Sequence, residues 1–335
     1  MKICVVGAGA IGGLMAVKLS LAGNEVTVID QGAHLAAIQK SGVKLIWEDG
    51  SEHVAKLKAV GSAAEAGPQD LVILAVKAHV LDQVARDVEA LLGKDSMIVT
   101  VQNGMPWWYF HDFKGPLKGT TLKTLDPSGL LARHIPGERI VGCVVYPAAA
   151  VTEPGVVKHV EGDRFPVGEL DGSASERVQT LHDLLVAAGF RSRVLDDIRS
   201  EIWLKAWGNL SFNPISALTH ATLEDICTFP ETRKLAAAMM AEAQVIGEKL
   251  GVTFRHTIEK RIEGAQSVGK HKTSMLQDVE AGRSLETEAL VGSILEMGQL
   301  VQVPAPSIEA VYACVKLLNK TMVMEHAGVT LKKAG

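Results

Sequence analysis

A lysine and two asparagines in the stretch Glu201–Asn213 have the types and spacing expected of a reaction site on a helix. Lys205, Asn209 and Asn213 follow one another at intervals of four residues, so a helix would present them as one polar ridge. A lysine ammonium can donate a proton, and carboxamides can hold a small polar ligand. The alternative is a buried helix whose lysine reaches solvent and whose asparagines satisfy backbone groups. The surrounding residues are bulky and apolar: Trp203, Leu204, Trp207, Leu210 and Phe212.

The first thirty residues have the pattern of a dinucleotide-binding unit. An apolar run of strand length leads directly into a glycine-rich loop, and a helix-like segment and a second strand follow. Gly7 permits the tight turn, Gly9 lets the backbone approach a pyrophosphate, and Gly12 allows close packing of helix on strand. The helix N-terminus then faces the anion. We expect the loop to bind a nicotinamide dinucleotide through Gly7, Gly9, Ala10, Ile11 and Gly12.

Asp30 ends the second strand and bears on the choice of cofactor. An acid at this place can accept the ribose hydroxyls of NAD and would repel the 2′-phosphate of NADP. The next residue is Gln31, and the nearest downstream cation is Lys40. The position therefore favours NADH over NADPH. Alternatively, Asp30 is a solvated loop acid and a base elsewhere neutralises the phosphate.

Two further polar residues follow apolar runs that read as buried parallel strands. Lys77 comes after residues 71–76, and Asn103 comes after residues 97–101. Ligands of doubly wound sheets bind outside the carboxyl ends of the strands. We therefore expect Lys77 and Asn103 to lie beside the cofactor, although either could be an ordinary polar loop residue.

The length of 335 residues predicts two domains. Strand-like runs dominate the first part, which includes a hairpin with a turn at Asp49-Gly50 and a last strand at 191–195. Helical periodicity begins near Asp197. We predict an α/β fold, with an N-terminal Rossmann domain of doubly wound, mostly parallel sheet at 1–195 and a C-terminal all-α domain at 196–335. Within the first domain, residues 105–136 are predicted to be irregular. They contain an aromatic cluster that could cap an active site, line a partner surface or simply pack.

Composition argues against several classes of function. The formal net charge is −4 without long single-sign runs, which makes nucleic acid an unlikely partner. No apolar stretch is long enough to span a membrane. The four cysteines are scattered and no metal-ligand spacing occurs, so we expect a reduced cytoplasmic protein without a metal site.

Several of these segments together resemble the ketopantoate reductase family, which contains 2-dehydropantoate 2-reductases and related 2-keto acid reductases. The matching motifs occur in order: V-V-G-A-G-A-I-G-G, A-V-K-A around Lys77, Q-N-G at 102–104, W-x-K-x-x-x-N-x-x-x-N-P at 203–214, and S-M-L-Q-D at 274–278 followed by L-E-T-E. The resemblance implies a reductase of pantothenate biosynthesis with a small 2-keto acid substrate, NADPH as the usual cofactor, and allows for a homodimer.

The resemblance also implies roles for individual residues. Lys205 would be the general acid that protonates the substrate carbonyl, and Glu286 would bind the hydroxyl side and orient Lys205. Ser274 would contact the substrate carboxylate. Lys77 and Asn103 would reach the cofactor and the edge of the substrate pocket. The remaining substrate-binding residues would be Asn209 and Asn213.

Two departures from the family pattern keep alternatives open. Asp30-Gln31 stands where NADPH-dependent members commonly have a basic residue, which again favours NADH. The segment 105–136 is longer than a compact connection and contains Trp107, Trp108, Tyr109 and Phe110. An NADH-linked 2-hydroxy acid dehydrogenase for a bulkier keto acid is therefore a second hypothesis. A non-catalytic nucleotide sensor is a third, although a sensor needs no proton donor such as Lys205.

Overall fold

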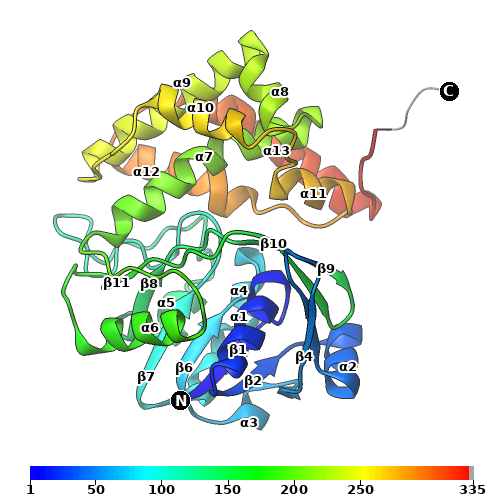
Figure 1. The fold of residues 1–335 in the computed structure, drawn as a ribbon. Coiled ribbons are helices and arrows are strands. Elements are labelled where there is room, and N and C mark those ends of the chain that lie inside the picture. Colours follow the sequence, from blue (N-terminus) through cyan, green and yellow to red (C-terminus); the bar gives the residue numbers. More distant parts are fainter. Residues whose placement is uncertain (332–335) are drawn as a thin grey trace. The chain divides into compact units, whose positions relative to one another are not determined.

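The structure is a computed structural model that describes residues 1–331, and the chain separates into two compact units (Figure 1). The first unit comprises Met1–Gln102 and Pro106–Ile198. The second comprises Asn103–Met105 and the chain from Arg199 onward. The chain thus passes briefly into the second unit at Asn103 and returns to the first at Pro106.

A seven-stranded sheet forms the centre of the first unit, with strand order β11-β8-β7-β6-β1-β2-β5. Neighbouring strands run parallel except for β11, which is antiparallel to β8. This is the order of a doubly wound sheet, so the predicted Rossmann fold is confirmed. The strands are β1 (Lys2–Val6), β2 (Glu25–Ile29), β5 (Lys58–Val60), β6 (Gln69–Leu74), β7 (Leu92–Thr100), β8 (Ile140–Cys143) and β11 (Val167–Gly168).

A second sheet in the same unit has the order β4-β3-β10-β9. Its β3 and β4 are antiparallel and joined by a turn in which Gly50 has φ +83°, so the predicted hairpin is confirmed. The parallel pairing of β3 with β10 joins segments more than a hundred residues apart, and the sequence pattern did not predict it. The strands are β3 (Val43–Ile46), β4 (Glu52–Ala55), β9 (Ala148–Glu153) and β10 (Val156–Glu161).

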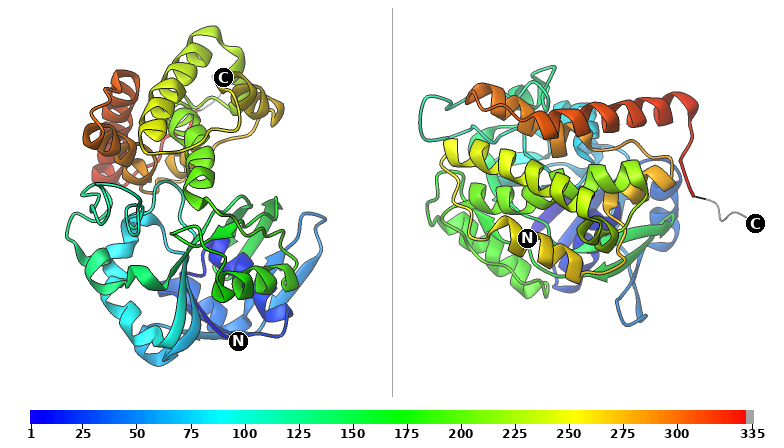
Figure 2. Two further views of the ribbon diagram at one scale, coloured as in Figure 1. Left: turned by 90° about the vertical axis from the view of Figure 1, so that its left-hand side faces the viewer. Right: turned by 90° about the horizontal axis from the view of Figure 1, so that it is seen from above.

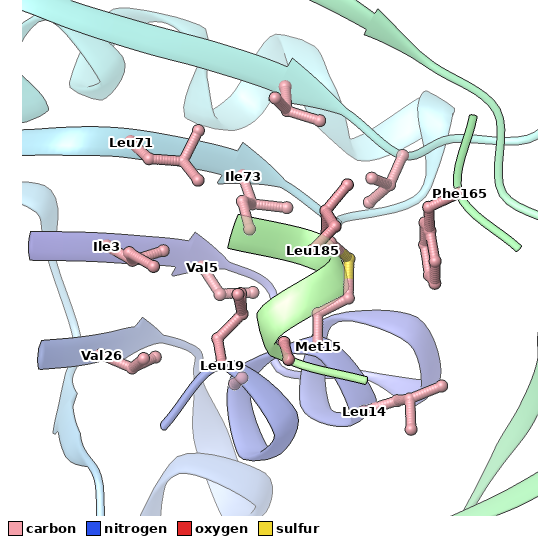
Figure 3. Close-up of a cluster of buried hydrophobic side chains, with 14 of the residues drawn as sticks. Ile3, Val5, Leu14, Met15, Leu19, Val26, Leu71, Ile73, Phe165 and Leu185 are labelled. Atoms are coloured by element: carbon pink, nitrogen blue, oxygen red, sulfur yellow. The ribbon is translucent and has the colours of Figure 1, made fainter. Parts of the chain in front are cut away.

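Helix α1 (Ala10–Leu21) contacts both sheets, which explains its apolar sequence. A helix that is hydrophobic on nearly all sides has to be buried on nearly all sides. One face packs on β1 and β2. On the other, a Cβ added to Gly13 would lie 2.7 Å from Cγ2 of Val157 in β10. Figure 3 shows Met15 of this helix in one buried cluster with Leu185 of α6 (Glu176–Ala187), Val5 of β1 and Ile73 of β6.

The segment 191–195 lies beside residues 163–167 in the parallel direction, as the strand prediction requires, but the pairing is too irregular to form a continuous strand. It makes two isolated bridges, Arg164 with Arg191 and Val167 with Val194. Four backbone hydrogen bonds join the two segments, from the N–H groups of Arg191, Phe165, Val167 and Leu195 to the carbonyl oxygens of Asp163, Arg191, Arg193 and Val167. The other helices of the unit are α2 (Gly32–Ser41), α3 (Ala63–Ala66), α4 (Leu81–Val84), α5 (Leu130–His134) and α6 (Glu176–Ala187), with 3-10 turns η1 (Ala78–Val80), η2 (Ala85–Leu91) and η3 (Gly137–Arg139).

The second unit is helical, as predicted. Helix α9 (Pro230–Lys249), drawn in yellow-green in Figure 2, contacts four other helices of the unit. No helix within residues 1–331 is both long and apolar enough to cross a bilayer. The other elements are α7 (Ile198–Thr219), α8 (Leu223–Thr228), α10 (Ile258–Ser267), α11 (Ser274–Glu280), the π-helix η4 (Glu288–Gly292), α12 (Ser293–Leu300) and α13 (Pro306–Glu325).

Candidate active site

The three glycines of the loop after β1 have different surroundings. Gly7 has φ +93°, and a Cβ there would meet Cγ1 of Val76 at 2.7 Å. A Cβ on Gly12 would lie 1.9 Å from the carbonyl oxygen of Gly7. Beside Gly9, in contrast, no atom lies within 4 Å of an added Cβ. Gly7 and Gly12 are therefore required by the fold of the loop, whereas Gly9 borders open space.

The open space lies at the N-terminus of α1. Gly9 is the N-cap residue and offers no side chain to cap the first turn, which begins with Ala10 and Ile11. The first N–H groups of a helix have no partner within the helix and carry a partial positive charge. The loop and the first turn can thus bind an anionic group such as a pyrophosphate.

The side chains of Asp30 and His34 hold the peptide groups of Ala8, which is fully buried. Oδ2 of Asp30 accepts the Ala8 N–H at 2.7 Å, and its Oδ1 accepts the N–H of Gln31 at 2.7 Å. Nε2 of His34 lies 2.8 Å from the Ala8 carbonyl oxygen. Sequence reasoning placed Asp30 at the cofactor but missed its bond to the loop. It missed His34 altogether, because nothing in the spacing links α2 to Ala8.

The end of β6 is fixed next to this loop. Lys77 follows β6 by three residues and immediately precedes η1. The Gln102 amide donates from Nε2 to the carbonyl oxygens of Leu74 and Val76, at 2.7 and 2.9 Å. Because Gln102 follows β7, its side chain ties together the ends of two neighbouring strands. Gln102 thus supports the strand ends beside the loop, a role that the sequence motif Q-N-G did not predict.

In the second unit, α7 is anchored by its tryptophans. Trp203 and Trp207 are completely buried, and both rings pack against Phe254, with centroids 6.2 and 4.7 Å from it. Trp207 also donates from Nε1 to the Met240 carbonyl oxygen of α9 at 2.7 Å. Lys205 lies between the two tryptophans in sequence and is half-buried. The packing of the tryptophans thereby fixes the position from which Lys205 extends.

The ammonium group of Lys205 donates from Nζ to Oδ1 of Asn103 at 2.6 Å. The turn after Asn103 reaches η4: Gly104 has φ +84°, and the Met105 N–H donates to the Ala289 carbonyl oxygen at 2.9 Å. The Ala289 carbonyl oxygen also accepts from the Ser293 hydroxyl at 3.0 Å, whereas the Ser293 N–H, which an α-helix would aim at it, donates to Glu288 in the π-helix.

The structure places the other predicted substrate residues as follows. Asn209 is half-buried and Asn213 buried on α7, one and two turns beyond Lys205. Glu286 is half-buried and stands three residues before the Ala289 carbonyl that receives the turn after Asn103. Ser274 is exposed as the first residue of α11. Asn103, Lys205 and the segment after Glu286 are therefore brought together.

The aromatic cluster after Asn103 is buried and lies in the first unit. Trp107, Trp108, Tyr109 and Phe110 are all buried, and Trp108 donates from Nε1 to Oγ1 of Thr100 at 3.0 Å. Of the three interpretations of this cluster, the burial favours ordinary packing. Within residues 1–331, no group of three or more His, Cys, Asp or Glu side chains is placed to hold a metal ion.

Comparison with known proteins gives the same family for both parts of the chain. The family described as "Ketopantoate reductase PanE/ApbA" matches residues 3–107, and "Ketopantoate reductase PanE/ApbA C terminal" matches residues 197–319. A 2-dehydropantoate 2-reductase from Mesorhizobium japonicum is 53% identical over 319 residues, covering 95% of this chain and 98% of that protein.

Solved structures resemble the chain over nearly its whole length. A Ralstonia solanacearum MolK2 protein proposed to be a ketopantoate reductase superposes with a TM-score of 0.92 at 40% identity, covering 96% of this chain and 98% of that one. D-mandelate dehydrogenase in complex with NADH and anilino(oxo)acetate has a TM-score of 0.83 at 23% identity, covering 96% and 99%. The second likeness concerns the fold alone.

Proposed function

Because this chain belongs to the ketopantoate reductase family, we propose that it reduces 2-dehydropantoate to pantoate with a nicotinamide cofactor. The observation that carries the proposal is the hydrogen bond from Lys205 to Asn103 at 2.6 Å. It holds a proton donor in place on a polar helix face, in a chain that also has a dinucleotide-binding loop. The 53% identity to a 2-dehydropantoate 2-reductase supports the choice of substrate.

The proposed reaction requires a hydride and a proton. The bound cofactor would supply the hydride to the carbonyl carbon of the keto acid. Lys205 would donate a proton from Nζ to the carbonyl oxygen as negative charge develops there, and its ammonium charge would stabilise that oxygen before transfer. The product is the 2-hydroxy acid, and solvent protons restore the charged Lys205.

Asn103, Glu286 and the helix face around Lys205 would hold and orient the reacting groups. Asn103 accepts from Lys205 through Oδ1, which leaves the amide N–H₂ of Asn103 as a donor for substrate or cofactor. Asn209 and Asn213 would bind the substrate from the same face of α7. We further propose that Glu286 orients Lys205 and that Ser274 contacts the substrate carboxylate.

For the cofactor, we propose a preference for NADH. The two oxygens of the Asp30 carboxylate accept from Ala8 and Gln31, but a carboxylate has about four acceptor sites. Asp30 can therefore still accept a ribose hydroxyl, and its negative charge opposes a 2′-phosphate. Lys77 and the loop residues Gly7, Gly9, Ala10, Ile11 and Gly12 would complete the cofactor site.

The role of Asp30 in cofactor choice is tested by Asp30→Asn. Asparagine keeps an oxygen for the Ala8 N–H and removes the charge, so the ratio of kcat/KM for NADPH to kcat/KM for NADH should rise about tenfold, a change worth about 1.4 kcal/mol. Asp30→Ala removes the acceptor as well, so it should weaken both cofactors. An unchanged ratio in Asp30→Asn would mean that Asp30 serves the loop and not the choice of cofactor.

The function itself is tested by steady-state assays of a small panel. The purified protein is given 2-dehydropantoate or phenylpyruvate, each with NADH and with NADPH, and cofactor oxidation is followed by absorbance. We expect kcat/KM to be highest for 2-dehydropantoate. The burial of Trp107–Phe110 supports ordinary packing of these side chains over a role in binding a bulkier substrate. Cofactor binding without turnover of any keto acid would favour the nucleotide-sensor hypothesis instead.

A further inference from the structure

The inference concerns His34, which lies on α2 and has contacts through both ring nitrogens. Nε2 is 2.8 Å from the carbonyl oxygen of Ala8 in the glycine-rich loop. Nδ1 accepts the backbone N–H of Gly155 at 3.0 Å, in the turn between β9 and β10. The ring therefore connects the loop after β1 with the second sheet.

These two contacts determine where the ring carries its proton. The Gly155 N–H needs a lone pair on Nδ1, so Nδ1 is unprotonated. The proton of the neutral ring is then on Nε2, from which His34 donates to the Ala8 carbonyl oxygen. A carbonyl cannot donate, so no other assignment satisfies both contacts.

Fixing the Ala8 carbonyl also fixes the direction of the next N–H. The peptide bond from Ala8 to Gly9 is planar and trans, so its C=O and N–H groups point in opposite directions. With the carbonyl held by His34, the Gly9 N–H points away from α2. It donates to no group within residues 1–331, and the space beside Gly9 is open.

We propose that His34 is a positioning residue for the dinucleotide: by holding the Ala8 carbonyl, it aims the Gly9 N–H at the cofactor's pyrophosphate. The inference rests on the proposed function, because it takes this loop as the cofactor site. Asp30 holds the preceding peptide through the Ala8 N–H, so the two side chains fix successive peptide planes. The second sheet contributes to cofactor binding through Gly155, although it contains none of the predicted cofactor residues.

Two amide substitutions separate the contacts of His34. In the His34→Gln variant the new side-chain N–H₂ can occupy the place of Nε2 and donate to Ala8. In the His34→Asn variant the shorter side chain places an oxygen near the position of Nδ1, where it can accept from Gly155. His34→Gln therefore keeps the contact that we hold responsible for aiming Gly9. His34→Asn keeps the contact with the second sheet and loses the one with the loop.

The test measures NADH dissociation constants by calorimetry or by fluorescence titration, together with kcat at saturating NADH and the melting temperature. We expect His34→Ala and His34→Asn to weaken NADH binding about tenfold, with kcat changed less than twofold. His34→Gln should bind within about threefold of wild type. His159→Ala is the control: Nε2 of this buried histidine contacts the Gly162 carbonyl oxygen at 2.6 Å in the second sheet, so its loss should lower the melting temperature and leave NADH affinity unchanged.

The outcomes distinguish the inference from the function on which it rests. If wild type binds neither NADH nor NADPH, the proposed function is wrong. If wild type binds NADH and His34→Asn binds it equally well, or if His34→Gln binds as weakly as His34→Asn, the role of His34 is wrong. Should His34→Ala fail to fold, the comparison of the glutamine and asparagine variants decides alone.

Discussion

Lys205 has a position that its own helix could suggest but not complete. Its spacing from Asn209 and Asn213 is a local property of α7 and was readable from the sequence. Its hydrogen-bond partner Asn103 is 102 residues away and follows a strand of the other unit. No local pattern predicts that pairing, which depends on the return of a distant turn to η4.

The proposed role of Lys205 predicts that Lys205→Ala lowers kcat by about 10²–10⁴-fold, because the developing alkoxide loses its proton donor. NADH affinity should be nearly unchanged, since the loop residues proposed to bind the cofactor belong to the other unit. Stopped-flow turnover and NADH titration measure the two effects separately. Lys320→Ala, which changes an exposed lysine of α13, is the matched control. A kcat within twofold of wild type would remove Lys205 as the acid.

The thiols provide a second prediction at this scale. Burial raises the pKa of the Cys4 thiol to about 12 and also raises the pKa of Cys227, so neither forms much thiolate at neutral pH. Cys143 is buried as well, whereas Cys314 is exposed on α13. We expect Ellman's reagent to titrate one thiol in the native protein at pH 8 and four in denaturant. Two or more fast thiols in the native state would contradict this.

Asp30 and His34 have contacts that no sequence motif predicts. Asp30 was predicted from its place after β2 to face the ribose, and the structure adds a bond to Ala8 that the motif does not contain. The sequence gives no indication of the contact between His34 and Ala8, since a single histidine on an amphipathic helix has many ordinary explanations. Both contacts arise because the chain folds back over 22 and 26 residues.

At the scale of elements, the loop–helix unit at the N-terminus separates two kinds of glycine. A Cβ on Gly12 would overlap the Gly7 carbonyl oxygen at 1.9 Å, and we expect Gly12→Ala to destabilise the protein by about 1–3 kcal/mol or more. Gly9 has φ −63° and ψ −157° and open space beside it, so Gly9→Ala should fold normally. Its added methyl would occupy the proposed pyrophosphate site and weaken NADH binding at least tenfold.

Thermal unfolding and NADH titration of both glycine variants check this contrast. A Gly9→Ala protein with wild-type NADH affinity would place the pyrophosphate elsewhere. A Gly12→Ala protein as stable as wild type would show that the loop adjusts more easily than its geometry indicates.

The turn after Asn103 gives another prediction about an element. Gly104 has φ +84°, and a Cβ there would lie 2.2 Å from the Ala289 carbonyl oxygen. Gly104→Ala should therefore displace Asn103 from Lys205 and lower kcat about tenfold or more, besides costing about 1–3 kcal/mol of stability. Gly119→Ala is the control, because Gly119 has φ +74° with open space around it. If both variants lose only stability, the turn does not position Asn103.

Most elements were predictable because their patterns are local. The apolar runs of β1, β2, β6 and β7 are buried on both faces, and parallel strands of this kind have continuous apolar sequences. The second sheet was not predictable as a layer, because β3 finds β10 only through tertiary folding. The segment 191–195 has a suitable composition and is hydrogen-bonded to residues 163–167, but it forms isolated bridges and not a continuous strand.

At the scale of the whole molecule, length and the change in periodicity near Asp197 predicted two kinds of architecture, a Rossmann unit and a helical unit. The family motifs then predicted the reaction, because each motif contains particular residues at a particular place in the fold, such as Lys205 at the start of the helical unit. Neither source could indicate the three-residue excursion at Asn103–Met105, in which chain from between two strands of the first unit becomes part of the second. Light scattering of the purified protein would test whether the chain forms the homodimer that the family resemblance allows.

That excursion limits how such proteins can exchange parts. A recombinant that joined residues 1–198 of this chain to the helical unit of a relative would bring its own Asn103 and Gly104 to a foreign η4. The Ala289 carbonyl and the glycine that fits it would then come from different parents. A functional chimera therefore needs three fusion points instead of one, on either side of residues 103–105 and after residue 198. The turn at 103–105 is then taken from the same parent as the helices. In this chain, the part that has to be exchanged as a whole is therefore the helical unit together with residues Asn103–Met105.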